Sequence, residues 1–110
     1  MFFLYLHCNN NVVFFKSMDF EWDDSKAETN FKKHQVRFSE AITVWMDENS
    51  LEMFDPDHSS KDEERWIRLG YSSHARILVV VYCEKIEGEK IRIISARKAI
   101  PQEQGQYHQG

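Results

Sequence analysis

The segment RILVVVYCEK, residues 76–85, is the strongest indication of the architecture of this chain. The run ILVVVY within it is apolar at every position, which is typical of a central strand that is covered on both faces. Residues 65–71 before it alternate between polar and apolar side chains, and residues 91–97 form a further strand after a Glu87-Gly88-Glu89 turn. Because the linkers are short, we expect consecutive strands to pair antiparallel as a meander.

Upstream of these strands, the sequence predicts two helices. Residues 18–22 alternate as in a short strand, and Ser25-Lys26-Ala27-Glu28 fits a capping box, in which a hydroxyl and a carboxylate satisfy free N–H groups at a helix start. A second helix is expected from about Ser39, because apolar residues recur at i, i+3, i+4 and i+7. We interpret this apolar stripe as core, and its members are Phe38, Ala41, Ile42 and Trp45.

Three further segments complete the expected fold. Residues 51–54 are strand-like, residues 55–60 form a loop, and Pro101 fits the first turn of a short C-terminal helix. The fold class is therefore α+β. We expect the N-terminal helices to pack on one face of a curved antiparallel sheet, with a short helix at the C-terminus.

Length and composition limit what the chain can be. Its 110 residues and 13.2 kDa suit one domain with an ordinary globular composition. Cys8 and Cys83 lie far apart, which excludes a CxxC redox pair and favours reduced thiols in the cytoplasm. Cys83 belongs to an apolar strand, so we interpret it as core and not as a nucleophile. No stretch approaches the ~20 apolar residues that a membrane span needs.

The first segment, Met1 to Ser17, looks like an addition to this domain. It has two short apolar runs split by polar residues, and it lacks the basic start and continuous apolar run of a secretory signal. It is either a hairpin with Asn9-Asn10-Asn11 as its turn, or upstream sequence that precedes a true start at Met18. We favour the second interpretation, in which residues 1–17 are a non-native or mis-started leader and residues 18–110 are one domain.

Charge is segregated along the chain. The net charge of -4 argues mildly against a nucleic-acid binder, yet residues 19–64 hold 14 acidic and 5 basic side chains, whereas residues 65–110 hold 8 basic and 4 acidic. Such a charge run is most simply a solvated face balanced by acidic helices. However, most of these cations are Arg, whose planar donors match phosphate, and Trp66, Tyr71 and Tyr82 lie among them. Arginines with aromatic rings are a basis for RNA recognition.

The densest polar cluster combines the loop at 57–59 with the charged residues at 63–65. His58 suits a general base near neutral pH, although an exposed loop histidine without a role is the simpler interpretation. A metal site formed by His58 with Asp55 and Asp57 lacks a known ligand spacing. We therefore expect neither a metal nor a cofactor.

Short segments spread over most of the chain carry a resemblance to a known family. They are Phe20-Glu21-Trp22-Asp23, Lys26-Ala27, Asn30, Lys33-His34, Val36, Phe38-Ser39-Glu40-Ala41, Asp57-His58-Ser59, Glu64-Arg65-Trp66, Gly70, Leu78-Val79-Val80-Val81 and Arg92-Ile93-Ile94-Ser95-Ala96-Arg97. Together these segments resemble the BrnT family of type II toxins. The resemblance runs in order from about Met18 to Ala99, and DHSxxxEERW and IRIISARKA are its most specific parts.

The resemblance implies a RelE-like fold and a ribonuclease that arrests growth by cutting RNA. It also implies a cognate BrnA antitoxin of ribbon-helix-helix type, which neutralises the toxin and through which alone the pair contacts operator DNA. It implies no metal, because enzymes of this fold class use side chains for attack by the 2′-hydroxyl. The chain departs from the family pattern at Gln35, where glycine usually follows Lys-His. A residue at positive φ, or a different helix cap, fits there.

On this hypothesis, the loop and the sheet assemble a catalytic site. Arg65, Arg92 and Arg97 clamp the phosphate, although a salt bridge within the sheet explains Arg97 nearly as well. His58 transfers a proton, with Glu64 as an alternative base or as an orienter of Arg65. The residues predicted to contact RNA around this site are Arg76, Tyr82 and Lys98.

The competing hypothesis is non-catalytic. The acidic helical half of the chain is complementary in charge to a basic partner. The chain would then be a protein-interaction module, or a decayed toxin that retains only antitoxin binding. Both roles can coexist, because a toxin also needs an interface for its antitoxin.

Overall fold

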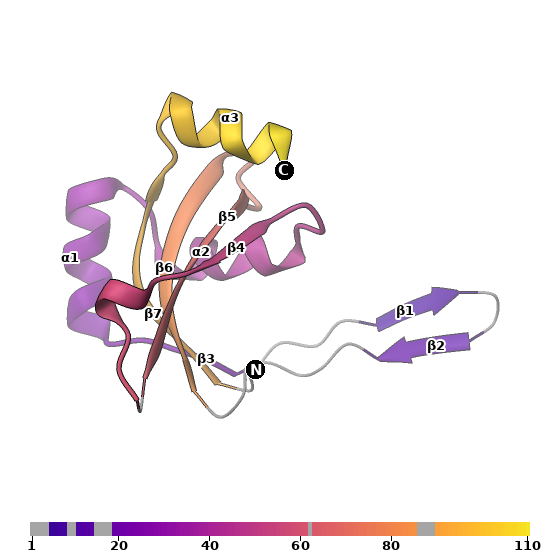
Figure 1. Cartoon of the computed structure of the whole chain (residues 1–110), viewed down its shortest axis with the longest axis horizontal. Coiled ribbons are helices and arrows are strands. Elements are labelled where there is room, and N and C mark those ends of the chain that lie inside the picture. Colours follow the sequence, from indigo (N-terminus) through magenta and orange to yellow (C-terminus); the bar gives the residue numbers. More distant parts are fainter. Residues whose placement is uncertain (1–4, 9–10, 15–18, 62, 86–89) are drawn as a thin grey trace.

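The structure is a computed structural model that describes residues 5–8, 11–14, 19–61, 63–85 and 90–110. Within these ranges it contains strands, α-helices and two short 3₁₀ helices, labelled η (Figure 1). In chain order they are β1 (Tyr5–Cys8), β2 (Asn11–Phe14), β3 (Asp19–Glu21), α1 (Asp24–His34), α2 (Phe38–Ala41), η1 (Ile42–Met46), β4 (Leu51–Phe54), η2 (Pro56–His58), β5 (Glu64–Tyr71), β6 (Ile77–Lys85), β7 (Lys90–Lys98) and α3 (Pro101–Gln109).

A five-stranded sheet with the order β3-β7-β6-β5-β4 forms the centre of the fold. Strands β4 to β7 pair antiparallel with their neighbours in sequence, which confirms the predicted meander with β6 at its centre. Strand β3 runs parallel to β7, with Phe20 opposite Ile91, so the sheet is mixed and not wholly antiparallel as predicted. Local sequence could not reveal this pairing, because it joins segments from opposite ends of the domain.

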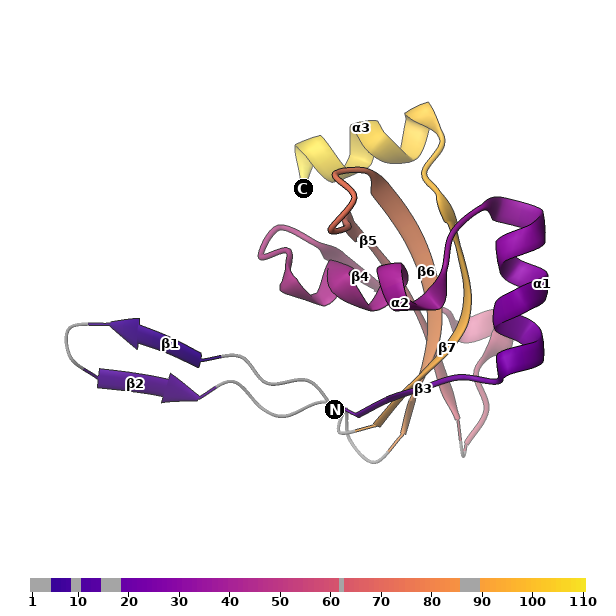
Figure 2. The ribbon, with the colours of Figure 1, turned by 180° about the vertical axis from the view of Figure 1, so that it is seen from behind.

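Alternation along β6 gives the sheet two faces with different covers. One face carries Leu78, Val80 and Tyr82, and α1, α2 and η1 pack there; we call it the helix face. The opposite face carries Val79 and Cys83, and we call it the arginine face after Arg65, Arg92 and Arg97. In Figure 1, α1 and α2 lie behind the sheet while β4 crosses in front of β6 and β7, and Figure 2 shows the same arrangement from behind.

The C-terminal helix covers one end of the arginine face. Tyr107 of α3 is buried there and packs with Leu69, Ile77 and Val79. Its hydroxyl donates a hydrogen bond to Asp47 Oδ2 (2.7 Å). Pro101 stands in the first turn of α3, as predicted. The other end of the arginine face is left to β4, η2 and solvent.

The capping box predicted at Ser25 is wrong. The first helix begins at Asp24, and its N-cap is Asp23, whose Oδ1 accepts a hydrogen bond from the backbone N of Lys26 (3.0 Å). Ser25 therefore lies inside the first turn. Both Asp23 and Ser25 are good capping residues, and the sequence alone could not rank them.

The second predicted helix is only four residues of α2 before the chain tightens into η1. Its apolar stripe is core, as predicted. Phe38 and Ala41 are buried, and Ile42 and Trp45 pack against the same cluster.

The N-terminal strands β1 and β2 pair antiparallel as a separate two-stranded sheet. Asn9 and Asn10 of the predicted turn, and the proposed start at Met18, lie outside the described residues, as does the turn at residues 87–89. The interpretation of residues 1–17 as a leader therefore stays a prediction. Among the described residues, no helix is both long and apolar enough to cross a membrane.

Candidate active site

Two arginines flank a buried cysteine in one row across three strands. Arg65 of β5 is opposite Cys83 of β6, and Cys83 is opposite Arg92 of β7. Directly opposed residues of an antiparallel sheet point to the same face, and neighbouring strands lie about 4.8 Å apart. Both guanidinium groups therefore rise from the arginine face, on backbones about 10 Å apart. Their side chains therefore extend from the same face of the sheet, on either side of Cys83.

A carboxylate at the β3 edge holds Arg92. Its Nε donates a hydrogen bond to Glu21 Oε2 (2.9 Å), and Lys90 and Lys85 lie 3.2 Å and 3.5 Å from the same carboxylate. The hydrogen bond from Arg92 lowers the pKa of Glu21, and Glu21 in turn raises the pKa of Arg92. Three cations thus share the Glu21 carboxylate, and Asp23 and Glu63 also act electrostatically on Arg92.

At the centre of the row, Cys83 is buried and its Sγ donates a hydrogen bond to Glu63 Oε1 (3.0 Å). Burial, helped by the Glu63 carboxylate, raises the pKa of Cys83 above its ordinary value. The group is therefore a poor thiolate source, which agrees with its interpretation as core. Glu63 belongs to the polar cluster expected from the sequence but was not assigned a role there, because nothing in the local pattern separates it from its acidic neighbours.

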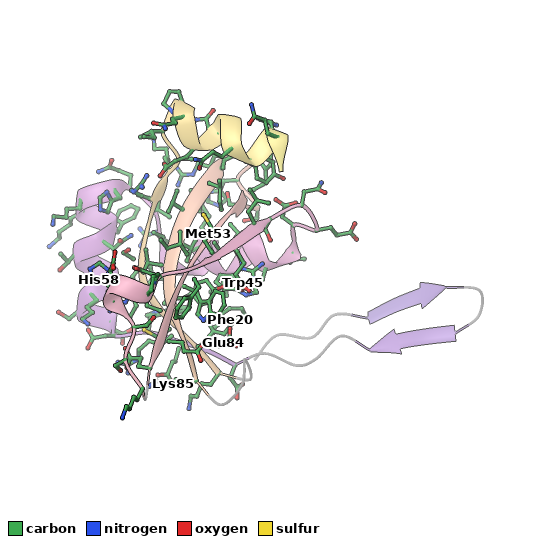
Figure 3. The ribbon with its side chains drawn as sticks, viewed as in Figure 1. Phe20, Trp45, Met53, His58, Glu84 and Lys85 are labelled. Atoms are coloured by element: carbon green, nitrogen blue, oxygen red, sulfur yellow. The ribbon has the colours of Figure 1, made fainter. Side chains whose placement is uncertain are left out.

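A short turn carries His58 beside the start of β5. Ser59 Oγ accepts a hydrogen bond from Arg65 N (2.8 Å) and donates one to Asp55 O (2.6 Å), while Asp55 N donates to Arg65 O (2.9 Å). These bonds join the turn that carries His58 to the backbone of Arg65. Figure 3 shows His58 on this turn.

Asp55 holds the imidazole of His58 through its Oδ2, which lies 2.9 Å from Nδ1. When the neutral ring donates from Nδ1 to this carboxylate, the lone pair of Nε2 remains free to accept a proton. The side chain of His58 is 64% exposed, so a substrate can reach it. An aspartate that fixes the tautomer and orientation of a histidine is the arrangement that a general base needs.

The nitrogen Nε of Arg65 is buried and has no hydrogen-bond partner among the residues that the structure describes. Buried donors are normally paired, so such a group calls for an explanation. The guanidinium of Arg65 also lies close enough to Cys83 to lower the pKa of that thiol, against the larger opposite effect of burial.

Arg97 forms a bidentate ion pair with Glu103 of α3. Its Nη1 and Nη2 donate to Oε1 and Oε2, both at 2.8 Å. Each partner favours the charged form of the other, so the pKa of Glu103 is lowered and that of Arg97 is raised. The salt bridge considered for Arg97 exists, but its partner lies on the helix and not in the sheet. The Arg97 side chain is still 41% exposed on the arginine face.

Three of the predicted residues stand on the helix face, away from this row. Glu64 is opposite Glu84, Lys98 is opposite Leu78, and Tyr82 is 0% exposed. A fully buried ring offers no surface on which a base can stack. The hydroxyl of Tyr82 instead donates to Glu52 Oε2, which helps to join β4 to the sheet.

Arg76 also lies apart from the row. It pairs with Glu40 of α2, with Nη2 to Oε1 at 2.6 Å and Nε to Oε2 at 2.8 Å, and it donates to Gln35 O (3.0 Å). The side chain of Glu40 is buried. Arg76 therefore ties the end of α1 to α2, in a structural arrangement.

Comparison with known proteins gives the chain its family. A family model described as the ribonuclease toxin BrnT of type II toxin–antitoxin systems matches residues 22–103. The chain belongs to the BrnT family. It is thus a ribonuclease toxin of a type II toxin–antitoxin system, as its resemblance implied.

The fold is also that of a BrnT structure. The crystal structure of the ribonuclease toxin BrnT from Brucella abortus matches with a TM-score of 0.54 and 23% identity, covering 76% of this chain and 99% of that one. No curated protein matches the chain.

In this BrnT-family chain a further arginine, Arg68, lies on the helix face, where the sequence did not predict a role for it. Arg68 donates to Ser50 Oγ (2.8 Å) and Glu52 Oε2 (2.6 Å), and its guanidinium carbon lies 4.8 Å from the centroid of the Trp45 ring. The alternation along β5 is visible in the sequence and places Arg68 and Arg65 on opposite faces of the sheet. Only the packing of η1 shows that Arg68 is a bridge between elements.

Within the described part of the chain, no group of three or more His, Cys, Asp or Glu side chains could hold a metal ion. The three residues considered for such a site in the sequence, Asp55, Asp57 and His58, contribute one close pair, Asp55 with His58.

Proposed function

We propose that this toxin cleaves RNA on the arginine face without a metal ion. Arg65 and Arg92 bind the cleaved phosphate, Arg97 contacts the RNA further along the same face, and His58 transfers the proton. The observation that carries the proposal is the row of Arg65, Cys83 and Arg92, with the His58 turn docked on the backbone of Arg65.

The reaction follows from the free Nε2 of His58. Nε2 takes the proton of a ribose 2′-hydroxyl, and the 2′-oxygen attacks the adjacent phosphorus. The P–O5′ bond breaks, the 5′-oxygen takes up a proton, and the products are a 2′,3′-cyclic phosphate and a 5′-hydroxyl. The guanidinium groups stabilise the charge that gathers on the non-bridging oxygens in the transition state. A positioned base contributes about 10²–10⁴-fold to such a reaction.

Glu63 replaces Glu64 in this proposal as the carboxylate of the site. Glu63 accepts from Cys83 in the centre of the row, whereas Glu64 is opposite Glu84 on the helix face. Together with Glu21, Glu63 raises the pKa of Arg92 and so favours the charged guanidinium. Its role is to orient the cations around the phosphate.

The wider biology follows from the family. The fold is RelE-like, the toxin arrests growth in the cytoplasm, and a BrnA-like antitoxin of ribbon-helix-helix type neutralises it. This antitoxin also carries the toxin to operator DNA. A charge-complementary surface for a basic partner lies in the acidic half of the chain, residues 19–64.

Induced expression in a bacterium that lacks the antitoxin tests the proposal. We expect growth arrest with the wild-type chain and growth with Arg65→Ala or His58→Ala at equal protein levels. RNA ends mapped from the arrested cells should carry 2′,3′-cyclic phosphates. If both variants, correctly folded, arrest growth as the wild type does, the assigned site is wrong.

The partner is tested separately by co-expression. A basic ribbon-helix-helix protein encoded beside the toxin gene should co-purify with the toxin and restore growth. Normal growth and intact RNA after wild-type induction would leave the non-catalytic interaction module as the function.

A further inference from the structure

A cavity of about 220 Å³ opens on the arginine face between β4 and α3. Strand β4 curls over the sheet, so that side chains of β4 and β7 line the same space although the two strands do not pair. The walls are apolar, and the mouth is polar. The residues that line the cavity are Met53, Ile67, Leu69, Val79, Arg97, Glu103 and Gln106.

The cavity begins two residues along β5 from the row of Arg65, Cys83 and Arg92. Ile67 in its wall is two residues from Arg65 on the same face, which is roughly 7 Å at the rise of a β-strand. Arg97 belongs to both places, because it lines the cavity and stands on the same strand and face as Arg92. A phosphate held by Arg65 and Arg92 would place the neighbouring nucleotide at the cavity mouth.

Two polar side chains of the cavity, Arg97 and Gln106, suit a planar ring that carries hydrogen-bonding groups at its edge. Because Glu103 holds both Nη atoms of Arg97, the guanidinium plane is fixed, and proteins use such planes to stack unpaired RNA bases. Gln106 is exposed on α3, and its amide can donate to and accept from a base edge. Met53 is 41% exposed, so apolar surface is available to the face of a ring.

We infer that this cavity holds one unpaired nucleobase of the RNA next to the cleaved phosphate. It gives the toxin a base preference at one fixed position beside the cut. The inference rests on the proposed function, since it requires that the phosphate is cut at the arginine row.

Cleavage of a short RNA pool by the purified toxin tests this inference. The pool is randomised around the cut, and sequencing of the product ends gives the rate for each base at each position. We expect the wild type to prefer one base about tenfold at one position, roughly the effect of one hydrogen bond, because the Gln106 amide can pair with only some base edges. Met53→Trp, which fills the cavity, and Gln106→Ala should remove most of this preference. Gln102→Ala, elsewhere on α3, is the matched control and should keep it.

The outcomes separate the two proposals. Equal cleavage of all four bases at every position, or a preference that Met53→Trp and Gln106→Ala both retain, would overturn the cavity as a base site while leaving the arginine row intact. If these variants keep the preference but lose antitoxin binding, the cavity instead receives a side chain of the antitoxin, and the inference is wrong. Cleavage that is insensitive to Arg65→Ala would instead refute the proposed function itself.

Discussion

The side chain of Asn30 on α1 pairs with the backbone of Ala96 on β7 as a neighbouring strand would. Its Nδ2 donates to Ala96 O (2.8 Å), and its Oδ1 accepts from Ala96 N (3.1 Å). Nδ2 also donates to Val36 O (3.0 Å). Asn30 is buried, so one amide fixes α1 and the segment after it to the strand that carries Arg92 and Arg97.

Asn30→Ala should destabilise the fold strongly. The substitution leaves buried backbone groups of Ala96 and Val36 unpaired, and each such group costs about 1–3 kcal/mol. We expect the free energy of unfolding in urea to fall by about 3 kcal/mol. Thr29→Ala, at the exposed neighbouring position of α1, is the control. Equal stability of the two variants would contradict this account of Asn30.

Gln35→Gly should stabilise the fold. Gln35 caps α1 in the left-handed region, at φ 56° and ψ 33°, which confirms the positive-φ alternative expected where the family has glycine. This conformation costs a non-glycine residue about 1–2 kcal/mol. The loss of its side-chain hydrogen bond to Lys32 O (3.2 Å) offsets part of the gain. We expect the free energy of unfolding to rise by about 0.5–1 kcal/mol. Lys32→Gly, in the last turn of α1, should instead lower it by about 0.5–1 kcal/mol. If Gln35→Gly instead lowers the free energy of unfolding, the positive φ of Gln35 does not strain the wild-type fold.

Stability should fall in acid through the buried carboxylate of Glu40. Burial alone would raise its pKa, but hydrogen bonds from Arg76 and Ser72 outweigh burial, so the pKa lies below its ordinary value of 4.5. A carboxyl with a lowered pKa adds stability above its unfolded pKa, and this stability is lost as pH falls through the folded value. Urea unfolding of the wild type and Glu40→Gln should therefore differ most near pH 7, and the difference should shrink progressively as pH falls below 4.5. A difference that is constant with pH would contradict the prediction.

Asp55→Asn should impair catalysis by mispositioning His58. Because Asp55 Oδ2 contacts His58 Nδ1, the amide no longer favours the tautomer in which Nε2 is free. We expect the cleavage rate at neutral pH to fall by about 10²-fold or more, with a changed pH profile and little change in KM. Asp57→Asn, in the same turn, serves as the matched control. An unchanged pH profile in Asp55→Asn would mean that Asp55 only shapes the turn.

Much of the fold could be predicted because its strands carry a clear binary pattern. Residues 76–85 are apolar on both faces, and the structure confirms them as the centre of an antiparallel meander. The parallel pairing of β3 and the N-cap at Asp23 depend on tertiary contacts and not on local sequence. The capping prediction failed because two good capping residues stand two positions apart.

The site was predicted less completely, because strand register decides which face of the sheet each candidate side chain occupies. Alternation fixes Arg65 and Glu64 on opposite faces once β5 is aligned, but the sequence alone does not show which face is open. Arginine is a residue type that often binds RNA phosphate, yet the guanidinium of Arg76 pairs with the buried Glu40 of α2. Tyr82 is an aromatic residue among arginines, yet it is core. In these three cases, contacts with residues distant in the sequence decide whether the side chain is available to RNA, and no short motif reveals such contacts.

In the proposed mechanism, Arg65 and Arg92 bind the phosphate that is cut. The most direct test is the cleavage rate of one RNA by the purified wild type, Arg65→Ala, Arg92→Ala and the control Arg37→Ala, each shown to be folded. Arg37 stacks on Phe31 at the helical side of the molecule. We predict that each site variant loses about 10²-fold in kcat/KM, whereas Arg37→Ala cleaves as the wild type does. Wild-type rates in both Arg65→Ala and Arg92→Ala would contradict the account.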